Sequence, residues 1–232
     1  MSADPSTRDT PEPPSRVLVN LGCGGVTPVR WINTDKSWRL ILKSLLPGRT
    51  SPPGTPRIRY LNLARRWPFA DGSVDVVYLS HVLEHLDTTI RKKVLDEAAR
   101  VLKSGGVLRI VVPDLYQLCR NYITEFERGD AKAAGRLLYW QNLHRENIYP
   151  RDRSLLKKMY DYLQGYPKQH RIMYDRFTLR EELSPDCWED PLFCGYGRSV
   201  HIVEIVDVER TREICPSLYV EALRKDALSA SM

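Results

Sequence analysis

Apolar and polar positions alternate along this chain in blocks that predict strands followed by helices. Short apolar runs at 17–21, 74–79 and 107–112 are typical of strands buried on both faces. Between the last two runs, residues 91–102 place apolar side chains at helical spacing, and a glycine pair at 105–106 follows as a stop signal. This alternation predicts an α/β fold in which helices cover a parallel sheet.

The pattern changes in the second half of the chain. Residues 57–61, in the first half, predict a further short strand, whereas residues 115–176 are a long stretch of mostly helical pattern, rich in Tyr, His and Arg. Residues 177–183 predict a last covering helix with Thr178 as its N-cap. The segments 201–208 and 217–223 alternate in a way that predicts a closing antiparallel pair of strands.

The first apolar run leads into a glycine turn, Gly22-Cys23-Gly24-Gly25, and a second short run ends in Asp35. Glycines allow a backbone to approach a ligand closely, and an acid at the tip of the next strand can accept hydrogen bonds from a ribose diol. The stretch 16–35 therefore predicts half of a nucleotide pocket.

Further motifs follow this turn in a fixed order. They are VLVNLGCGG at 17–25, INTD at 32–35, LNL at 61–63, WPFADGSVDVVYLSHVLEHL at 67–86 and LDEAARVLKSGGVLRIVVPD at 95–114. Together they resemble the type 11 group of class I S-adenosylmethionine-dependent methyltransferases, including members associated with sugar and polysaccharide biosynthesis. The resemblance implies a Rossmann-like sheet, mostly parallel with an antiparallel last strand, and an inserted helical region that covers the substrate.

The resemblance also implies which residues hold S-adenosylmethionine. The turn would pass beside the methionine part of the cofactor, and the carboxylate at the end of the next strand would bind the ribose hydroxyls. An asparagine, where the family usually has Asp, would bond the adenine amino group, and the next backbone N–H would face the ring. Two residues at the end of the VDVVYL strand would line the methyl end. The implied cofactor-binding residues are Gly22, Cys23, Gly24, Asp35, Asn62, Leu63, Ser80 and His81.

One departure from dinucleotide-binding proteins is visible in the same stretch. Only about ten residues separate Gly24 from Asp35, so the first crossover has room for a very short helix at most. A nicotinamide dehydrogenase would place its acid roughly 20 residues after the turn. The spacing therefore argues against that class of enzyme.

Two histidine-containing clusters are candidates for chemistry. In the first, His81, Glu84 and His85 share one face of a helix start, and they are either a general base with a substrate ligand or capping and packing residues. No further ligand is spaced to complete a metal site with them, so no metal is expected.

The second cluster precedes the helix at 177–183. Its His170, Tyr174 and Asp175 either position a substrate hydroxyl and take its proton or tie the insertion to the core. We expect His85 and His170 to be catalytic, and Glu84, Tyr174 and Asp175 to bind substrate.

These features divide the chain into four parts. Residues 1–15, rich in Pro, Ser and Asp, predict a disordered tail. Residues 16–114 predict the Rossmann-like half that binds the cofactor, residues 115–176 a helical insertion or lid, and residues 177–232 the completion of the sheet. The Tyr- and Leu-rich insertion either roofs the pocket or buries a homodimer face.

Composition limits the partners and the compartment. The net charge of +6 permits anionic partners, but no run of five or more Lys or Arg is present, so nucleic acid is not favoured. No apolar run is long enough to span a membrane, and the N-terminus does not read as a signal peptide. The cysteines are odd in number and lack C-x-x-C spacing, which predicts reduced thiols in a cytoplasmic protein; they are Cys23, Cys119, Cys187, Cys194 and Cys215.

The favoured hypothesis is an S-adenosylmethionine-dependent methyltransferase that acts on a small-molecule or glycan acceptor, at oxygen. One alternative is an RNA or protein methyltransferase, although the strand-end segment at 112–115 is not the Asn-Pro-Pro-aromatic motif of amino-methylating enzymes. A second alternative is a catalytically silent binding protein with the cofactor fold.

Overall fold

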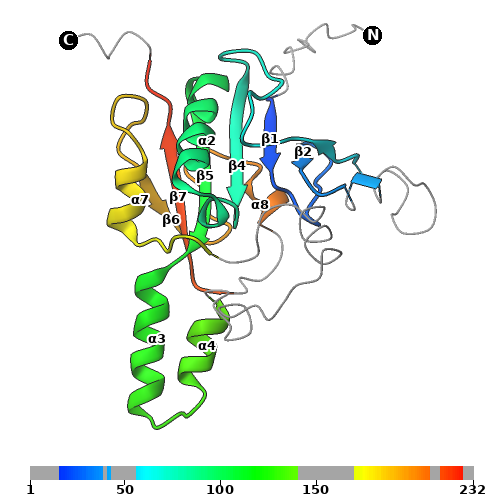
Figure 1. Ribbon diagram of the computed structural model, residues 1–232. Helices are drawn as coiled ribbons and strands as arrows, with labels where there is room; N and C mark the ends of the chain where they lie inside the picture. The colour runs from blue at the N-terminus through cyan, green and yellow to red at the C-terminus, as the bar shows by residue number, and fades with distance from the viewer. Residues whose placement is uncertain (1–15, 39–40, 43–55, 141–169, 210–214, 227–232) are drawn as a thin grey trace, which may run out of the picture.

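The apolar runs of the sequence form a seven-stranded sheet with the order β3-β2-β1-β4-β5-β7-β6 in the computed structural model (Figure 1). The structure describes residues 16–38, 41–42, 56–140, 170–209 and 215–226. The strands are β1 (Leu18–Leu21), β2 (Ile32–Asp35), β3 (Arg59–Tyr60), β4 (Val74–Ser80), β5 (Leu102–Pro113), β6 (Leu192–Cys194) and β7 (Ser217–Leu223). The helical elements are η1 (Leu83–His85), α2 (Thr88–Val101), α3 (Leu115–Glu127), α4 (Ala133–Trp140), α7 (Arg176–Glu182) and α8 (Ile205–Val208).

Five neighbouring strands of the sheet run parallel, and β7 runs antiparallel between β5 and β6. The predicted α/β class, with a mostly parallel sheet and an antiparallel last strand, is confirmed. Because β1, β4 and β5 are parallel, their carboxyl ends meet at one edge of the sheet, which is where open α/β sheets bind ligands.

The prediction of a strand at 201–208 is wrong. That segment ends in the short helix α8, and β7 pairs antiparallel with β5 on one side and with β6 on the other. Ile202, Ile205 and Val208 are buried at intervals of three, whereas Val203 and Val206 are exposed. A period of three is helical, so burial against the sheet determines the structure here in spite of the β-branched composition.

The two faces of the sheet carry different cover. On one face, the core includes side chains of α2 and α7, such as Val94 and Leu179. On the other face, α8 and the residues before it pack against β1 and β4, with Ile205 in the same cluster as Leu18 and Val76. The β1–β2 connection contains turns and no helix, so it contributes no covering helix to this second face beside β1.

The long region after β5 begins with two helices. Figure 1 shows α3 and α4 projecting beyond the carboxyl edge of the sheet, at the bottom of the view. The rest of the predicted insertion, 141–169, and the predicted tail, 1–15, lie outside the described residues. None of the helices that the structure describes is both long and apolar enough to cross a membrane.

Candidate active site

The glycine turn after β1 is held in a conformation that only glycine adopts easily. Gly22 and Gly24 have φ values of +61° and +53°. A Cβ on Gly22 would lie 2.6 Å from Cγ2 of Val82, whereas a Cβ on Gly24 or Gly25 would meet no heavy atom within 4 Å. The turn is therefore packed tightly at its start and open above its second half.

Cys23 lies in this turn and has a packing role. Its backbone N–H donates to the carbonyl of Thr34 at 2.9 Å, which ties the turn to β2. Burial, and secondarily the charge of Asp35, raises the pKa of the Cys23 thiol to about 12. The thiol therefore stays protonated and is not a nucleophile at neutral pH.

Asp35 ends β2 beside the turn. Its Oδ2 accepts the N–H of Gly24 at 3.0 Å, and its Oδ1 accepts the N–H of Ser37 at 2.7 Å. A carboxylate has about four acceptor positions. Asp35 is thus oriented by the backbone and keeps acceptor capacity for a diol.

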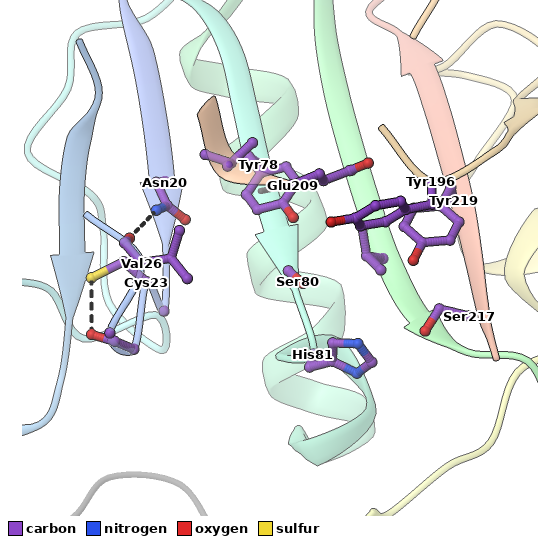
Figure 2. Close-up of a pocket in the computed structure, with 15 residues that line it drawn as sticks. Asn20, Cys23, Val26, Tyr78, Ser80, His81, Tyr196, Glu209, Ser217 and Tyr219 are labelled. Atoms are coloured by element: carbon purple, nitrogen blue, oxygen red, sulfur yellow. Dashed lines mark hydrogen bonds between the residues drawn. The ribbon is translucent and has the colours of Figure 1, made fainter. Parts of the chain in front are cut away.

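A cavity of about 390 Å³ starts at the glycine turn and extends along the second face of the sheet past the end of β4 (Figure 2). Five of the predicted cofactor-binding residues line it, namely Gly22, Cys23, Gly24, Ser80 and His81. The other predicted site residues do not line it; they are Asp35, Asn62, Leu63, Glu84, His85, His170, Tyr174 and Asp175.

Asn62 and Leu63 follow β3, beyond Asp35. The side-chain oxygen of Asn62 accepts the N–H of Ala64 at 3.1 Å, and Leu63 is buried. An amide oxygen has two acceptor positions. The contact between Asn62 and an adenine amino group therefore stays a prediction that the local geometry permits.

The far wall of the cavity was missed by sequence reasoning. It is formed by three tyrosines and an acid, which we call the tyrosine wall, namely Tyr78, Tyr196, Tyr219 and Glu209. Figure 2 shows the ring of Tyr78 on β4 and those of Tyr196 and Tyr219 beside β5 and β7. Burial raises the pKa of Tyr78 to about 12, so its hydroxyl keeps its proton. The one local feature of the sequence that could have indicated this wall is a tyrosine between two turn glycines at 195–197.

A buried arginine holds this wall in place. Arg109, on β5, is fully buried and contacts both oxygens of Glu209, with Nε–Oε1 and Nη2–Oε2 distances of 3.0 Å, and Oε1 of Glu221 at 3.2 Å. Glu209 also accepts the N–H of Gly197 at 2.7 Å, and Glu221 accepts that of Val200 at 3.2 Å. The two carboxylates therefore fix the 195–201 loop against the sheet.

Three imidazoles surround the Glu84 carboxylate at the end of β4; we call this set, His81, Glu84, His85 and His170, the Glu84 cluster. Oε1 of Glu84 lies 3.2 Å from Nδ1 of His81 and 4.0 Å from Nε2 of both His85 and His170. The side chain of Glu84 is fully buried, whereas that of His81 is 41% exposed and reaches the cavity. The structure thus brings His170 to the cluster of His81, Glu84 and His85, whereas the sequence pattern places it in a second cluster.

Two features of the Glu84 cluster bear on its chemistry. His81 adopts φ +53°, a strained value for a residue with a Cβ, which is typical of functional positions. Burial lowers the pKa of His170 to about 4, so its imidazole is neutral at neutral pH.

Tyr174 and Asp175 have structural contacts. The fully buried Tyr174 donates its hydroxyl to Glu182 at 3.4 Å. Asp175, and not Thr178 as predicted, is the N-cap of α7: its carboxylate accepts the N–H groups of Phe177 and Thr178, while Thr178 completes a capping box. These hydrogen bonds, with that from the Thr178 backbone the largest cause, lower the pKa of Asp175. The contacts support the alternative in which the segment ties the insertion to the core.

Comparison with known proteins gives one family match. A family model described as "Methyltransferase domain" matches residues 19–110, which span β1 to most of β5. The matched range includes the glycine turn, Asp35, Asn62, Ser80 and the part of the Glu84 cluster on η1.

Solved structures with low similarity were also found. One is a SAM-dependent methyltransferase from Archaeoglobus fulgidus, with 16% identity, a TM-score of 0.46, and coverage of 91% of this chain and 87% of that chain. Another is magnesium protoporphyrin IX methyltransferase from Synechocystis with bound SAH, with 14% identity, a TM-score of 0.46, and coverage of 91% and 75%. A third is a putative methyltransferase from Haloferax volcanii in complex with an activator protein, with 13% identity, a TM-score of 0.48, and coverage of 91% and 83%.

Proposed function

We propose that this chain, whose residues 19–110 match a methyltransferase domain model, is an S-adenosylmethionine-dependent methyltransferase that methylates an oxygen atom of a small hydroxylated molecule or glycan. The observation that carries the proposal is the cavity, which joins the glycine turn to the tyrosine wall. Its volume of about 390 Å³ is in the range of sites for small molecules.

The residues beside the turn fit the cofactor. The space above Gly24 and Gly25 is open, and Asp35 is oriented with acceptor capacity left for a ribose diol. When bound, S-adenosylmethionine supplies an electrophilic methyl group on a sulfonium. The protein then has to hold donor and acceptor in line at close range and exclude water.

The tyrosine wall suits a hydroxylated acceptor. Tyrosine rings pack against the apolar faces of a sugar or small ring, and their hydroxyls with Ser80, Ser217 and Glu209 supply hydrogen-bond partners. None of the described residues that line the cavity is Lys or Arg, so it offers no counter-charge to a phosphate backbone. This favours a neutral hydroxylated acceptor over RNA.

His81 is the group placed to take a proton from such an acceptor. It lines the cavity, and its Nδ1 lies 3.2 Å from Oε1 of Glu84. A carboxylate beside one ring nitrogen orients an imidazole and fixes a proton on that nitrogen, which leaves Nε2 for the substrate hydroxyl. His85 and His170, which do not line the cavity, act in this proposal through Glu84 as positioning residues.

The test is a methyl-transfer screen with the full chain and S-adenosylmethionine carrying a labelled methyl group. Three acceptor pools are compared: small hydroxylated compounds with short glycans, total RNA, and a protein extract. The proposal predicts label in the first pool, recovered as a methyl ether by mass spectrometry and reduced in His81→Gln but not in His201→Gln. His201 is a suitable control because it does not line the cavity and contacts Ser199 and Glu221 through its backbone N–H. Label in RNA or protein alone would contradict the proposal.

A further inference from the structure

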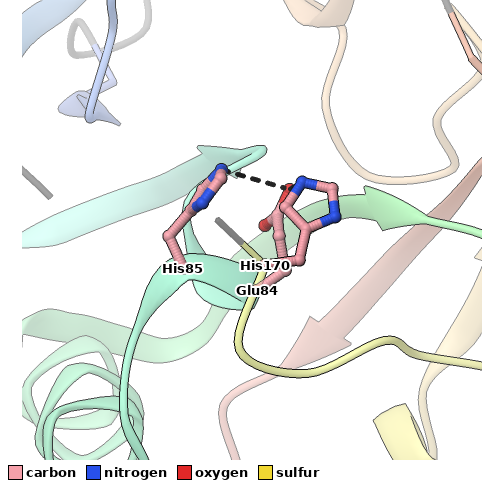
Figure 3. A group of neighbouring side chains, drawn as sticks. All are labelled: Glu84, His85 and His170. Atoms are coloured by element: carbon pink, nitrogen blue, oxygen red, sulfur yellow. Dashed lines mark ion pairs between the residues drawn. The ribbon is translucent and has the colours of Figure 1, made fainter. Parts of the chain in front are cut away.

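We infer that Glu84, His85 and His170 bind a divalent transition-metal ion of the zinc type. The three side chains offer one ligand atom each, and these atoms all lie within 4.8 Å of one another. Figure 3 shows His85 and His170 approaching the Glu84 carboxylate from two separate segments of the chain. Convergence of this kind is how proteins assemble metal sites from residues far apart in sequence.

The distances suit a common ion after small side-chain adjustments. Zinc binds imidazole nitrogen and carboxylate oxygen at about 2.0–2.2 Å, which places two ligands of a tetrahedral ion roughly 3.3–3.6 Å apart. Nε2 of His85 and Nε2 of His170 each lie 4.0 Å from Oε1 of Glu84. The two imidazole rings meet edge-on, with centroids 4.8 Å apart.

The Glu84 carboxylate has an oxygen that the described part of the protein does not satisfy. Its side chain is fully buried, and Oε2 has no hydrogen-bond partner among the described residues. Leaving a buried carboxylate oxygen unsatisfied is costly, and native proteins usually pair such charges or use them to coordinate metals. An ion held by both carboxylate oxygens would satisfy Oε2 and offset the buried charge, and Oε1 has a second acceptor position for its contact with His81.

The backbone holds the ligands together before any ion binds. Glu84 and His85 lie in the single turn of η1, and the carbonyl of Glu84 accepts the N–H of Arg171 at 2.7 Å. This bond fixes the segment after His170 against the turn that carries the other two ligands. A site whose ligands are held in place loses little conformational entropy when it binds its metal.

The donor set selects the kind of ion. Two imidazoles and one carboxylate suit zinc and neighbouring transition metals, whereas magnesium and calcium prefer oxygen ligands. With three protein ligands, a tetrahedral ion keeps an open position for water or substrate.

The test is direct metal binding by the full chain, without cofactor or acceptor. Protein stripped with a chelator is titrated with Zn²⁺ by calorimetry and with Co²⁺, whose visible absorption reports tetrahedral coordination. We expect one ion per chain, and a loss of affinity of about 100-fold or more in His85→Gln and in His170→Gln. His201→Gln should bind as the unaltered chain does. Comparison of these variants separates the site from binding to cysteine thiols.

The outcomes separate this inference from the proposed function. Binding of one ion that His85→Gln and His170→Gln weaken supports the site, whatever the methyl-transfer screen gives. Absence of stoichiometric binding, or binding that neither variant alters, overturns it. Binding of S-adenosylhomocysteine, followed in the same variants, shows whether they are folded: if it is retained, lost metal affinity reflects lost ligands. If His170→Gln does not fold, the metal affinity of His85→Gln alone tests the site.

Discussion

The backbone N–H of Gly24 donates a hydrogen bond of 3.0 Å to Oδ2 of Asp35 and thereby joins the turn after β1 to the end of β2. The two strands are parallel neighbours, yet the connection between them contains no helix. The hydrogen bond, with that from Cys23 to Thr34, therefore positions the turn where a covering helix is absent. Asp35 shapes the turn as well as offering acceptor positions to a ligand.

Gly22→Ala should destabilise the protein by about 2 kcal/mol. The positive φ costs about 1–2 kcal/mol for a residue with a Cβ, and the new methyl group would lie 2.6 Å from Cγ2 of Val82. Chemical denaturation measures the loss. Gly25→Ala is the matched control, because its Cβ would meet nothing within 4 Å. Equal stability of the two variants would contradict the packing described for this turn.

Asp175→Ala should lower stability by about 1 kcal/mol, the usual effect of removing an N-cap, and leave the affinity for S-adenosylhomocysteine unchanged. The reason is that the Asp175 carboxylate accepts the N–H groups of Phe177 and Thr178 and does not line the cavity. Asp190→Ala removes an exposed carboxylate paired with Arg180 and should have little effect. A loss of ligand affinity in Asp175→Ala alone would restore the substrate-binding role predicted from sequence.

Glu97 should contribute stability that acid removes. Hydrogen bonds from Arg100, opposed by burial and aided by the N–H of Trp67, lower the pKa of Glu97 below its ordinary 4.5. The unfolded chain then binds the proton more readily, so this contribution is present above pH 4.5 and is lost as the pH falls through the folded value. Denaturation curves at neutral and acid pH should show a smaller acid loss in Glu97→Gln than in the unaltered chain. An equal loss in both would count against this assignment.

His81→Gln should lower methyl transfer by about 100-fold or more, the usual contribution of a general base, without abolishing cofactor binding. His170→Gln should act in the same direction, because His170 faces the Glu84 carboxylate that orients His81. Steady-state rates and a separate cofactor titration check this, with His201→Gln as the control. Unchanged turnover in His81→Gln would remove the proton-transfer step from the proposal.

The half of the candidate site near β1 and β2 is predicted from local signals in the sequence. Gly22, Gly24 and Asp35 lie within a short stretch, and each residue type has a backbone or hydrogen-bonding reason for its place. The parallel strands were predictable for a similar reason, since buried strands such as β4 are near-continuous apolar runs.

The other half depends on contacts between distant segments. His170 reaches Glu84 through a backbone hydrogen bond of the next residue, Arg171, and no spacing rule connects positions so far apart. Tyr196 and Glu209 reach the cavity because Arg109, on β5, holds their segment. The prediction of a strand at 201–208 was wrong because the apolar residues there fit both the helical and the strand period. Only their burial in the fold distinguishes the two.

The most direct test of the central claim is a calorimetric titration of S-adenosylhomocysteine into the full chain, Asp35→Ala and Asp75→Ala. Asp75 is the matched control because its carboxylate also accepts a backbone N–H next to β1, that of Val17 at 2.8 Å, and it does not line the cavity. We predict binding to the unaltered chain and to Asp75→Ala, and a severe loss in Asp35→Ala. No binding to the unaltered chain, or equal binding to all three proteins, would contradict a cofactor site built on the glycine turn and Asp35.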